Sequence, residues 1–177
     1  LQALFKEVEK LTQEGAKAAL SHTGALAGKK EVYFGVFNQT GVIKADSLEE
    51  MFDIASLVEE KTKIRKGRVQ IITNGGGYGI ITTDNIAKTS NLKMAKMSNT
   101  LAKILRKKFP STVNIGNPLD LVGDAQSDRY EFALNYLIKD KNIDVLVLIV
   151  LIQTPIIVED LEKIMLKYKK LTTKPIV

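Results

Sequence analysis

The sequence predicts an α/β fold built on parallel sheets, and three observations lead to this prediction. The run Val145 to Ile152 is almost unbroken apolar, as expected of a central parallel strand covered on both faces. The β-branched run Val69 to Thr73 is followed by a glycine-rich turn and by a helix-like segment from Ile80 to about Lys88. Strand-like and helix-like segments then alternate to the end of the chain. This order is typical of a flavodoxin-like or Rossmann-like parallel sheet.

In the first part of the chain the sequence predicts three helices and a short strand. Apolar residues at helical spacing indicate an amphipathic helix over residues 1 to about 12, and another helix that starts near Val32 and ends near Gly41. A short strand is expected at 42–45. Ser47 stands three residues before Glu50, which predicts a capping box that opens a helix from 48 to about 59.

A charged run over residues 59–67 breaks this pattern and is the natural linker. We therefore place a domain boundary there, with domains at 1–64 and 65–177. In the second domain, helices are also expected over 98–108, from a Ser127 cap to about 139, and from Pro155 to about 170. The start of a further strand is expected at 174–177.

The amino-acid composition excludes several classes of protein and of binding site. The chain has 177 residues, 45% of them hydrophobic, which is enough for one large domain or two small ones. No apolar run approaches the roughly 18 residues of a membrane span, and no signal peptide is recognised, although the chain begins at Leu1 without a methionine. With no cysteine and one histidine, thiolate zinc sites, disulfides and histidine-rich metal centres are excluded, so no metal site is predicted.

The net charge and the aromatic content indicate which classes of binding partner to expect. A net charge of +6 would suit phosphorylated ligands such as coenzyme A or nucleotides, but the lysines are spread along helix faces, where solvation alone explains them. Aromatic residues make up only 6% of the chain and tryptophan is absent, so a nucleic-acid partner is not expected. The lack of cysteine fits a reducing cytoplasm.

The first candidate site is the stretch 21–28, which carries the only histidine, His22. Its imidazole, with an unperturbed pKa of about 6.5, is mostly neutral at cytoplasmic pH and can accept a phosphoryl group without a separate base. Ser21 and Thr23 offer hydroxyl donors, and Gly24 lets the backbone approach an anion. Taken alone, a single histidine is more often a surface or hydrogen-bonded structural residue.

The second candidate is the glycine-rich turn made of Asn74, Gly75, Gly76, Gly77, Tyr78 and Gly79. A turn between a strand and a helix directs backbone N–H groups and the positive end of the helix dipole at one spot, which suits a phosphate. It does not match the dinucleotide fingerprint, because Ile80 holds the place of the third glycine, and no Gly-Lys-Ser/Thr follows as in a Walker loop. A tight structural turn is the alternative interpretation.

The third candidate is residues 114–124, Asn-Ile-Gly-Asn-Pro-Leu-Asp-Leu-Val-Gly-Asp, whose Asn-Pro and Gly-Asp steps alone predict only a loop. Together, however, the candidates resemble the ADP-forming (NDP-forming) acyl-CoA synthetases, relatives of succinyl-CoA synthetase. Residues 14–20 followed by Ser-His-Thr-Gly and Ala-Gly resemble their phosphohistidine loop. The strand with Thr-Asn-Gly-Gly-Gly, followed by Asn-Pro-Leu-Asp-Leu and Gly-Asp-Ala, resembles their next domain.

The resemblance implies two succinyl-CoA ligase-like domains of flavodoxin type, the first incomplete and the second truncated at its C-terminus. In the family a buried strand and a turn precede the segment that begins here at Glu14, whereas Gln13 runs straight into Glu14. Either that strand has been lost, or residues are missing from the sequence as given, and we favour the second interpretation.

The resemblance also implies a reaction, with this chain as part of the α-subunit or α-like region. Enzymes of the family interconvert acyl-CoA, ADP and phosphate with free acid, CoA and ATP, through an acyl phosphate and a phosphohistidine. By position His22 would be the nucleophile, and the turn 74–79 would stabilise the phosphoryl group with a helix N-terminus. The resemblance also implies that Ser21, Thr23 and Gly24 position the loop. It further implies that Asn117 and Asp120 shape the pocket wall.

Partners follow from the same resemblance. We expect an ATP-grasp β subunit or a fused ATP-grasp domain, where Mg²⁺ would bind beside ADP or ATP. CoA is expected as a substrate, and no tightly bound cofactor is expected. The protein should form a hetero- or homo-oligomer and should bind neither a membrane nor nucleic acid. The fragment alone should be inactive. No acidic residue can be matched to the carboxylate that steadies the phosphohistidine, since Glu14 is near only in sequence. The alternatives are a non-catalytic CoA- or nucleotide-binding regulatory module, as in fused acyltransferases, and an unrelated α/β interaction domain.

Overall fold

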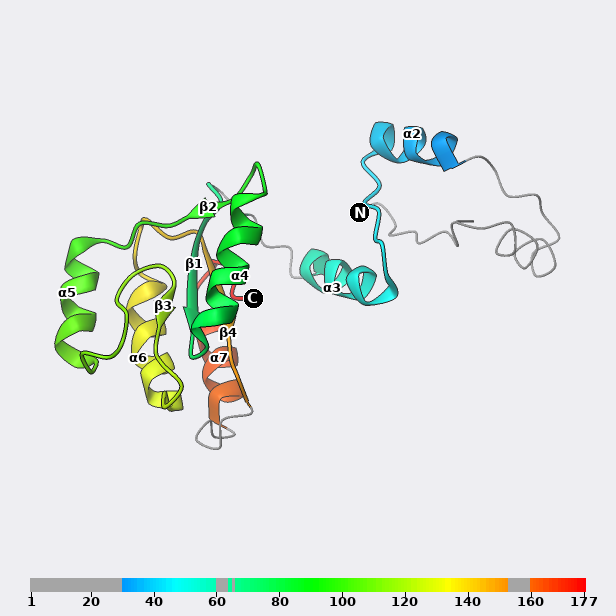
Figure 1. Cartoon of the computed structure of the whole chain (residues 1–177). Helices are drawn as coiled ribbons and strands as arrows, with labels where there is room; N and C mark the ends of the chain where they lie inside the picture. Colours follow the sequence, from blue (N-terminus) through cyan, green and yellow to red (C-terminus); the bar gives the residue numbers. More distant parts are fainter. Residues whose placement is uncertain (1–29, 60–63, 65, 153–159) are drawn as a thin grey trace. The chain divides into compact units, whose positions relative to one another are not determined.

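A computed structural model of the chain describes residues 30–59, 64, 66–152 and 160–177 (Figure 1). The chain divides into two compact units, Leu1–Lys61 and Thr62–Val177, each described here by itself. The division falls inside the charged run at 59–67 that suggested a linker.

The described part of the first unit contains two helices, α2 (Lys30–Thr40) and α3 (Leu48–Glu59). The start of α3 confirms the predicted cap, since the Ser47 hydroxyl accepts the Glu50 N–H at 3.0 Å. The Glu50 carboxylate accepts the N–H of Asp46 at 2.6 Å, one residue before the position used in a standard capping box. The strand predicted at 42–45 is wrong. No strand lies beside this segment in the described part of the unit, and extended backbone needs such a partner to form a ladder.

The described part of the second unit is built on a parallel sheet, as predicted. Its strands are β1 (Arg68–Thr73), β2 (Lys93–Met94), β3 (Leu119–Asp120) and β4 (Val145–Ile149). Strand β4 pairs with β1 from Val69 to Thr73 on one edge. On the other edge, β2 pairs with the beginning of β1 and β3 with its end. Strand β1 is therefore central, which explains its apolar, β-branched sequence.

The two short strands were not predicted, because two residues are too few to leave a pattern. The strand expected at 174–177 is present as a parallel bridge between Ile176 and Leu146 on the outer edge of β4.

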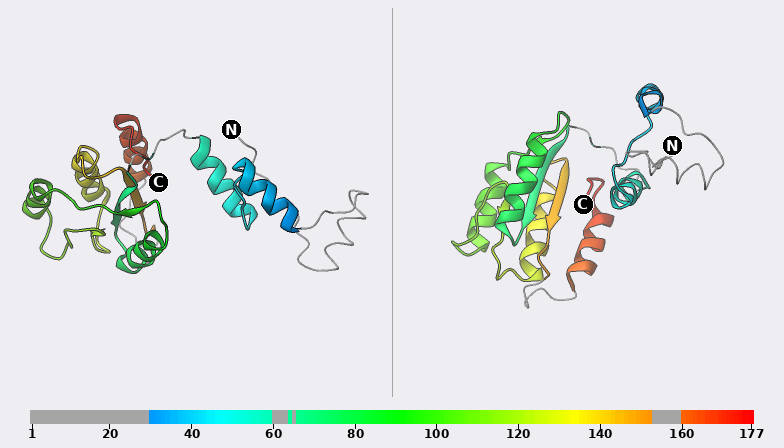
Figure 2. Two further views of the ribbon diagram at one scale, coloured as in Figure 1. Left: turned by 90° about the horizontal axis from the view of Figure 1, so that it is seen from above. Right: turned by 45° about the vertical axis from the view of Figure 1, so that its right-hand side comes forward.

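Helices cover both faces of this sheet. Figures 1 and 2 show α4 (Gly76–Ala87) on one face, and α5 (Asn99–Lys108), α6 (Ser127–Leu137) and α7 (Asp160–Leu171) on the other. The main core lies on the three-helix face, where Ile72 of β1 packs in one cluster with α5, α6 and α7. A smaller core lies under α4, where Ile86 packs in one cluster with Val69 and Ile71 of β1. This is the layered α/β arrangement that the sequence predicts.

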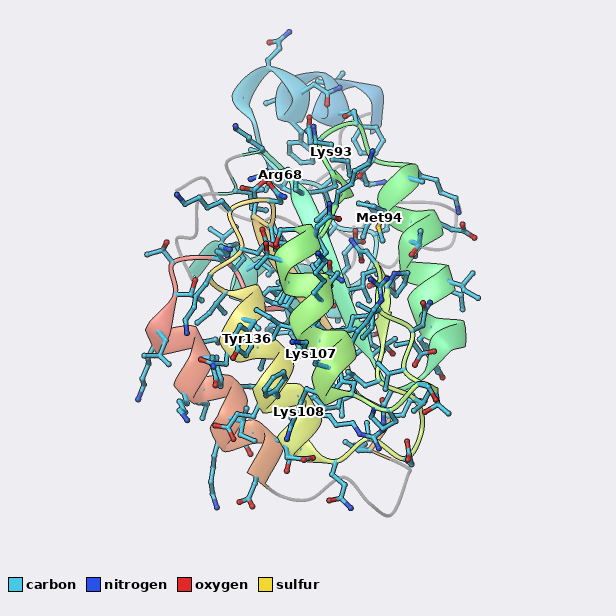
Figure 3. All side chains as sticks on the ribbon, turned by 90° about the vertical axis from the view of Figure 1, so that its left-hand side faces the viewer. Arg68, Lys93, Met94, Lys107, Lys108 and Tyr136 are labelled. Atoms are coloured by element: carbon cyan, nitrogen blue, oxygen red, sulfur yellow. The ribbon has the colours of Figure 1, made fainter. Side chains whose placement is uncertain are left out.

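The helix starts differ from prediction in two places. Helix α5 has the expected cap, with the Ser98 hydroxyl accepting the Leu101 N–H at 3.3 Å. In α6 the N-cap is Gln126, and Ser127 is the first helical residue, so the predicted Ser127 cap is wrong. Helix α4 begins at Gly76 rather than near Ile80. In Figure 3 the labelled side chains of Lys107 and Lys108 extend from the end of α5, and that of Tyr136 from α6.

Candidate functional site

The two predicted motifs of the second unit meet at the carboxyl edge of the sheet. The glycine-rich turn follows β1, and the Asn-Pro-Leu-Asp segment contains β3. The two strands end side by side, because Ile72 pairs with Leu119 and Thr73 with Asp120. Ligands of open parallel sheets bind outside the carboxyl ends of the strands. The candidate site therefore lies where such a fold places one.

The glycine-rich turn is the first turn of α4, with Gly75 as its N-cap. The buried Thr73 hydroxyl fixes this cap from both sides, since it accepts the Gly75 N–H at 2.9 Å and donates to the Gly75 carbonyl at 3.1 Å. A Cβ on Gly75 would overlap Cδ1 of Leu151, so any other residue there would force the Leu151 side chain to shift. The cap residue is thus held in place by both its neighbour and its packing.

Close packing also explains why a helix starts in a glycine-rich sequence. A Cβ on Gly79 would lie 3.2 Å from the Pro118 side chain and 3.3 Å from that of Thr73. Glycine at this position therefore lets α4 approach β1 and the Asn-Pro segment closely. Tertiary contacts of this kind override the low intrinsic helix propensity of glycine.

The beginning of α4 presents free backbone donors. The N–H groups of Tyr78 and Gly79 are bonded to the Gly75 carbonyl at 3.1 and 3.3 Å. Within the described part of the chain, the N–H groups of Gly76 and Gly77 have no acceptor. The first N–H groups of a helix lack intrahelical partners and carry the positive end of its dipole, so they favour an anion. The Tyr78 side chain is 55% exposed.

Asp120 stands next to this helix start. Its Oδ2 atom is 2.8 Å from the position that a Cβ of Gly76 would occupy. Its Oδ1 atom accepts the N–H of Val122 at 3.0 Å. Val122 has a φ of 60°, a left-handed conformation that is unusual for a β-branched residue, and the Asp120 side chain stabilises that turn. The structure thus brings Asp120 to the turn, and its role in a pocket wall stays a prediction.

The Asn117 side chain is part of the sheet. Strands β2 and β3 leave a gap along β1, and the Asn117 amide fills it. Its oxygen accepts the Ile71 N–H at 2.9 Å, and its nitrogen donates to the carbonyls of Val69 at 2.6 Å and Ala95 at 3.1 Å. Asn117 therefore shapes the site by fixing the loop to β1.

The Asn74 side chain is likewise engaged by the backbone. Its Oδ1 atom accepts the Leu151 N–H at 2.8 Å, and its Nδ2 atom donates to the Leu151 carbonyl at 3.4 Å. Asn74 is only 3% exposed. The side chain extends the pairing of β1 with β4 beyond its last backbone pair, so in this structure its amide serves the sheet.

Sequence reasoning missed two residues of α6 that hold this edge. Arg129 donates to the Leu121 carbonyl at 2.9 Å and to the Asp124 carboxylate at 2.7 Å, and this guanidinium holds the pKa of Asp124 below its usual range. The Tyr130 hydroxyl donates to the Ile149 carbonyl at 3.2 Å. Both residues belong to an ordinary helical pattern, so only the tertiary structure shows what they contact.

The remaining predicted site residues, Ser21, His22, Thr23 and Gly24, lie outside the described residues, as does the join at residues 13–14. In the part of the chain that the structure describes, no group of three or more His, Cys, Asp or Glu side chains could hold a metal ion. None of the described helices combines the length and apolarity needed to cross a membrane.

Two open grooves lie elsewhere, along α6 and α7, and both include Asp128, Glu131 and Lys167. The charges in their walls neutralise one another, for example where Lys167 donates to Glu131 at 2.7 Å. These grooves therefore present paired surface charges rather than a set of groups aimed at a ligand.

Comparison with known proteins agrees with this picture. Residues 8–58 match the succinyl-CoA ligase like flavodoxin domain, and residues 69–176, more than half of the chain, match the ligase-CoA domain. The chain is 40% identical to acetate–CoA ligase (ADP-forming) I of Archaeoglobus fulgidus over 78% of the chain and 20% of that protein. It is 35% identical to the α subunit of acetate–CoA ligase (ADP-forming) II of Pyrococcus furiosus over 81% of the chain and 31% of that subunit.

A solved structure shows the same fold. The acetyl-coenzyme A synthetase 1 of Ca. Korarchaeum cryptofilum, in complex with phosphate and ADP, matches 93% of this chain and 36% of its own chain, with a TM-score of 0.77 and 31% identity. The chain thus spans less than half the length of each of these relatives. On the match over residues 69–176, the chain belongs to the ligase-CoA domain family, with a succinyl-CoA ligase like flavodoxin domain matched before it.

Proposed function

We propose that the chain is part of an ADP-forming acyl-CoA synthetase, which converts acyl-CoA, ADP and phosphate into free acid, CoA and ATP. The observation that carries the proposal is the meeting of the glycine-rich turn and the Asp120 loop at the start of α4, where the Gly76 and Gly77 N–H groups have no acceptor among the described residues and could bind an anion. Relatives named as ADP-forming acetate–CoA ligases, similar over most of this chain, support it.

The proposed reaction has three steps. A phosphate oxygen attacks the thioester carbonyl, the C–S bond breaks, and CoA leaves as a thiol after taking up a proton. A ring nitrogen of His22 then attacks the phosphorus of the acyl phosphate, and the carboxylate leaves. Finally, a β-phosphate oxygen of ADP attacks the phosphohistidine, the N–P bond breaks, and ATP forms.

The described residues would contribute to the second step. The phosphoryl group carries negative charge throughout its transfer, and the two free N–H groups at the start of α4, with the helix dipole, would stabilise that charge without reorganising. Ser21, Thr23 and Gly24 would position the histidine loop for this step. Asp120 and Asn117 would hold the neighbouring loop.

Other parts of the enzyme would supply the nucleotide chemistry. We assign Mg²⁺ to the site of ADP in an ATP-grasp β subunit or fused domain, where it would neutralise phosphate charge. The α-subunit names of the P. furiosus relatives support such a partner. We further propose a hetero- or homo-oligomer located in the cytoplasm. The alternative of a non-catalytic binding module is not favoured, because the named relatives are ligases.

The acyl group remains open in this proposal. Relatives named for acetate and for 4-hydroxybutyrate are equally similar, at 40% and 39% identity. The test therefore incubates the full-length protein and its ATP-grasp partner with ADP, phosphate, Mg²⁺ and acetyl-, propionyl- or 4-hydroxybutyryl-CoA. We expect ATP and free thiol in a one-to-one ratio with at least one thioester, and no ATP with His22→Ala. Thiol release without ATP, or CoA binding with no turnover of any thioester, would contradict the proposal.

A further inference from the structure

Tyr130 occupies a special position among the buried side chains of the second unit. It lies in the first half of α6, it is fully buried, and its ring packs in the main core. Its hydroxyl leaves that core and donates to the Ile149 carbonyl, at 3.2 Å, in the last residue of β4. A packing role explains the ring, but it does not explain why the ring carries a hydroxyl at this edge of the sheet.

The hydroxyl binds the end of β4 directly beside the end of β1. It donates to the carbonyl of Ile149, which pairs with Thr73, the last residue of β1. The Thr73 hydroxyl in turn accepts the N–H of Gly75, the N-cap of α4. The Tyr130 hydroxyl therefore holds the strand end beside the residue that fixes the start of α4.

Burial raises the pKa of Tyr130, the nearby Asp120 charge raises it further, and the hydrogen bond with the Asn74 backbone only partly offsets these effects. The phenol is therefore neutral at physiological pH and always has a proton to donate. A phenol that does not ionise cannot act as a general base, and it brings no negative charge toward a phosphoryl group. Its chemistry suits holding a backbone in place.

We propose that Tyr130 is a positioning residue for phosphoryl transfer: its hydroxyl joins the ends of β1 and β4 so that the Gly76 and Gly77 N–H groups face the phosphoryl group. This inference rests on the proposed function. Donors that stabilise a transferring group act through their placement, and a misplacement of about 1 Å costs up to about a hundredfold in rate.

The test separates the two half-reactions of the full-length protein with its ATP-grasp partner. Labelled ATP and Mg²⁺ first form the phosphoenzyme, a step that takes place at the nucleotide. The isolated phosphoenzyme is then mixed with CoA and the acid that discharges the wild-type protein. We expect Tyr130→Phe to take up label at the wild-type rate and to discharge it at least tenfold more slowly, with little change in the KM for the acid.

The matched control is Tyr136→Phe, which removes a tyrosine hydroxyl from the same helix but at a partly buried position labelled in Figure 3. It should discharge at the wild-type rate. Because Tyr130→Phe keeps the buried ring, the rates are compared at a temperature below both unfolding transitions, which calorimetry measures. A general loss of stability would slow labelling and discharge together and would overturn the inference.

The remaining outcomes separate the two proposals. If the wild-type protein is labelled and Tyr130→Phe discharges as fast as Tyr136→Phe, the positioning role is wrong and the proposed function stands. If the wild-type protein takes no label on His22, the proposed function fails, and the role of Tyr130 in phosphoryl transfer fails with it.

Discussion

The Asp120 carboxylate lies against the first residue of α4, with its Oδ2 atom 2.8 Å from the position that a Cβ of Gly76 would take. Side chains essentially never approach so closely, so any residue but glycine at 76 forces Asp120 to move. At the neighbouring Gly77 the corresponding space is open. A methyl group added at Gly76 would therefore overlap the Asp120 carboxylate, whereas one added at Gly77 would have free space.

We predict opposite effects of alanine at these two positions. Gly77→Ala should raise the unfolding free energy by about 0.5–1 kcal/mol, because alanine is the better helix former. Gly76→Ala should lower it despite the same propensity gain, because the displaced Asp120 loses its bond to Val122 and the turn opens. Calorimetry of both variants in the full-length protein checks this, and equal shifts in unfolding temperature would show that the Asp120 contact is not there.

Replacing Asn117 should weaken the centre of the sheet. Asn117→Leu leaves the Ile71 N–H without a partner beside β1, whereas the Val69 carbonyl keeps its bond from the Ala95 N–H at 2.8 Å. An unsatisfied buried group costs about 1–3 kcal/mol, so we expect a loss of that size in denaturant unfolding. Asn85→Ala, on the exposed side of α4, is the control and should change little. A tolerated Asn117→Leu would mean that the amide is not the partner of β1.

The Arg68–Asp144 pair should make stability depend on acidity. Arg68 donates to the Asp144 carboxylate at 2.7 Å, and this bond lowers the Asp144 pKa to about 2. A carboxyl group whose pKa falls on folding stabilises the folded state above its unfolded pKa, and this contribution disappears as the pH drops toward the folded pKa.

We therefore expect Asp144→Asn to cost about 1 kcal/mol at pH 7, after allowance for solvent screening, and the difference from wild type to vanish between about pH 4 and pH 2. Denaturant unfolding across this range measures it. Asp160→Asn, which breaks an exposed pair with Lys163, is the control and should change the stability at pH 7 little. A constant difference at all pH values would exclude the ionic origin.

The sequence was sufficient for those parts of the fold that have a strong local pattern. A hydrophobic pattern that extends over more than one turn or a few residues marks the buried run of β1, the apolar run of β4 and the amphipathic helices α3, α5 and α7. The short strands β2 and β3 carry none, since two residues become a strand only through their neighbour β1. The predicted strand at 42–45 failed for the converse reason, because a suitable sequence lacks a neighbouring strand in the described part of its unit.

The candidate site was predictable as a place but not in its details. The glycines and the Asn-Pro-Leu-Asp segment marked two loops, and the sheet topology brings them together. Other details depend on contacts between residues far apart in sequence. Such contacts decide what the amides of Asn74 and Asn117 bind, and they bring Tyr130 to the same edge. No spacing rule records such contacts.

The proposal that His22 carries the phosphoryl group is tested most directly by labelling. The full-length protein is incubated with its ATP-grasp partner, Mg²⁺ and ATP labelled at the γ-phosphate, and the label is located by peptide mass. The account predicts an acid-labile, alkali-stable label on His22 that CoA and a carboxylic acid discharge, and no label in His22→Ala. A label on another residue, or full labelling of His22→Ala, would contradict it.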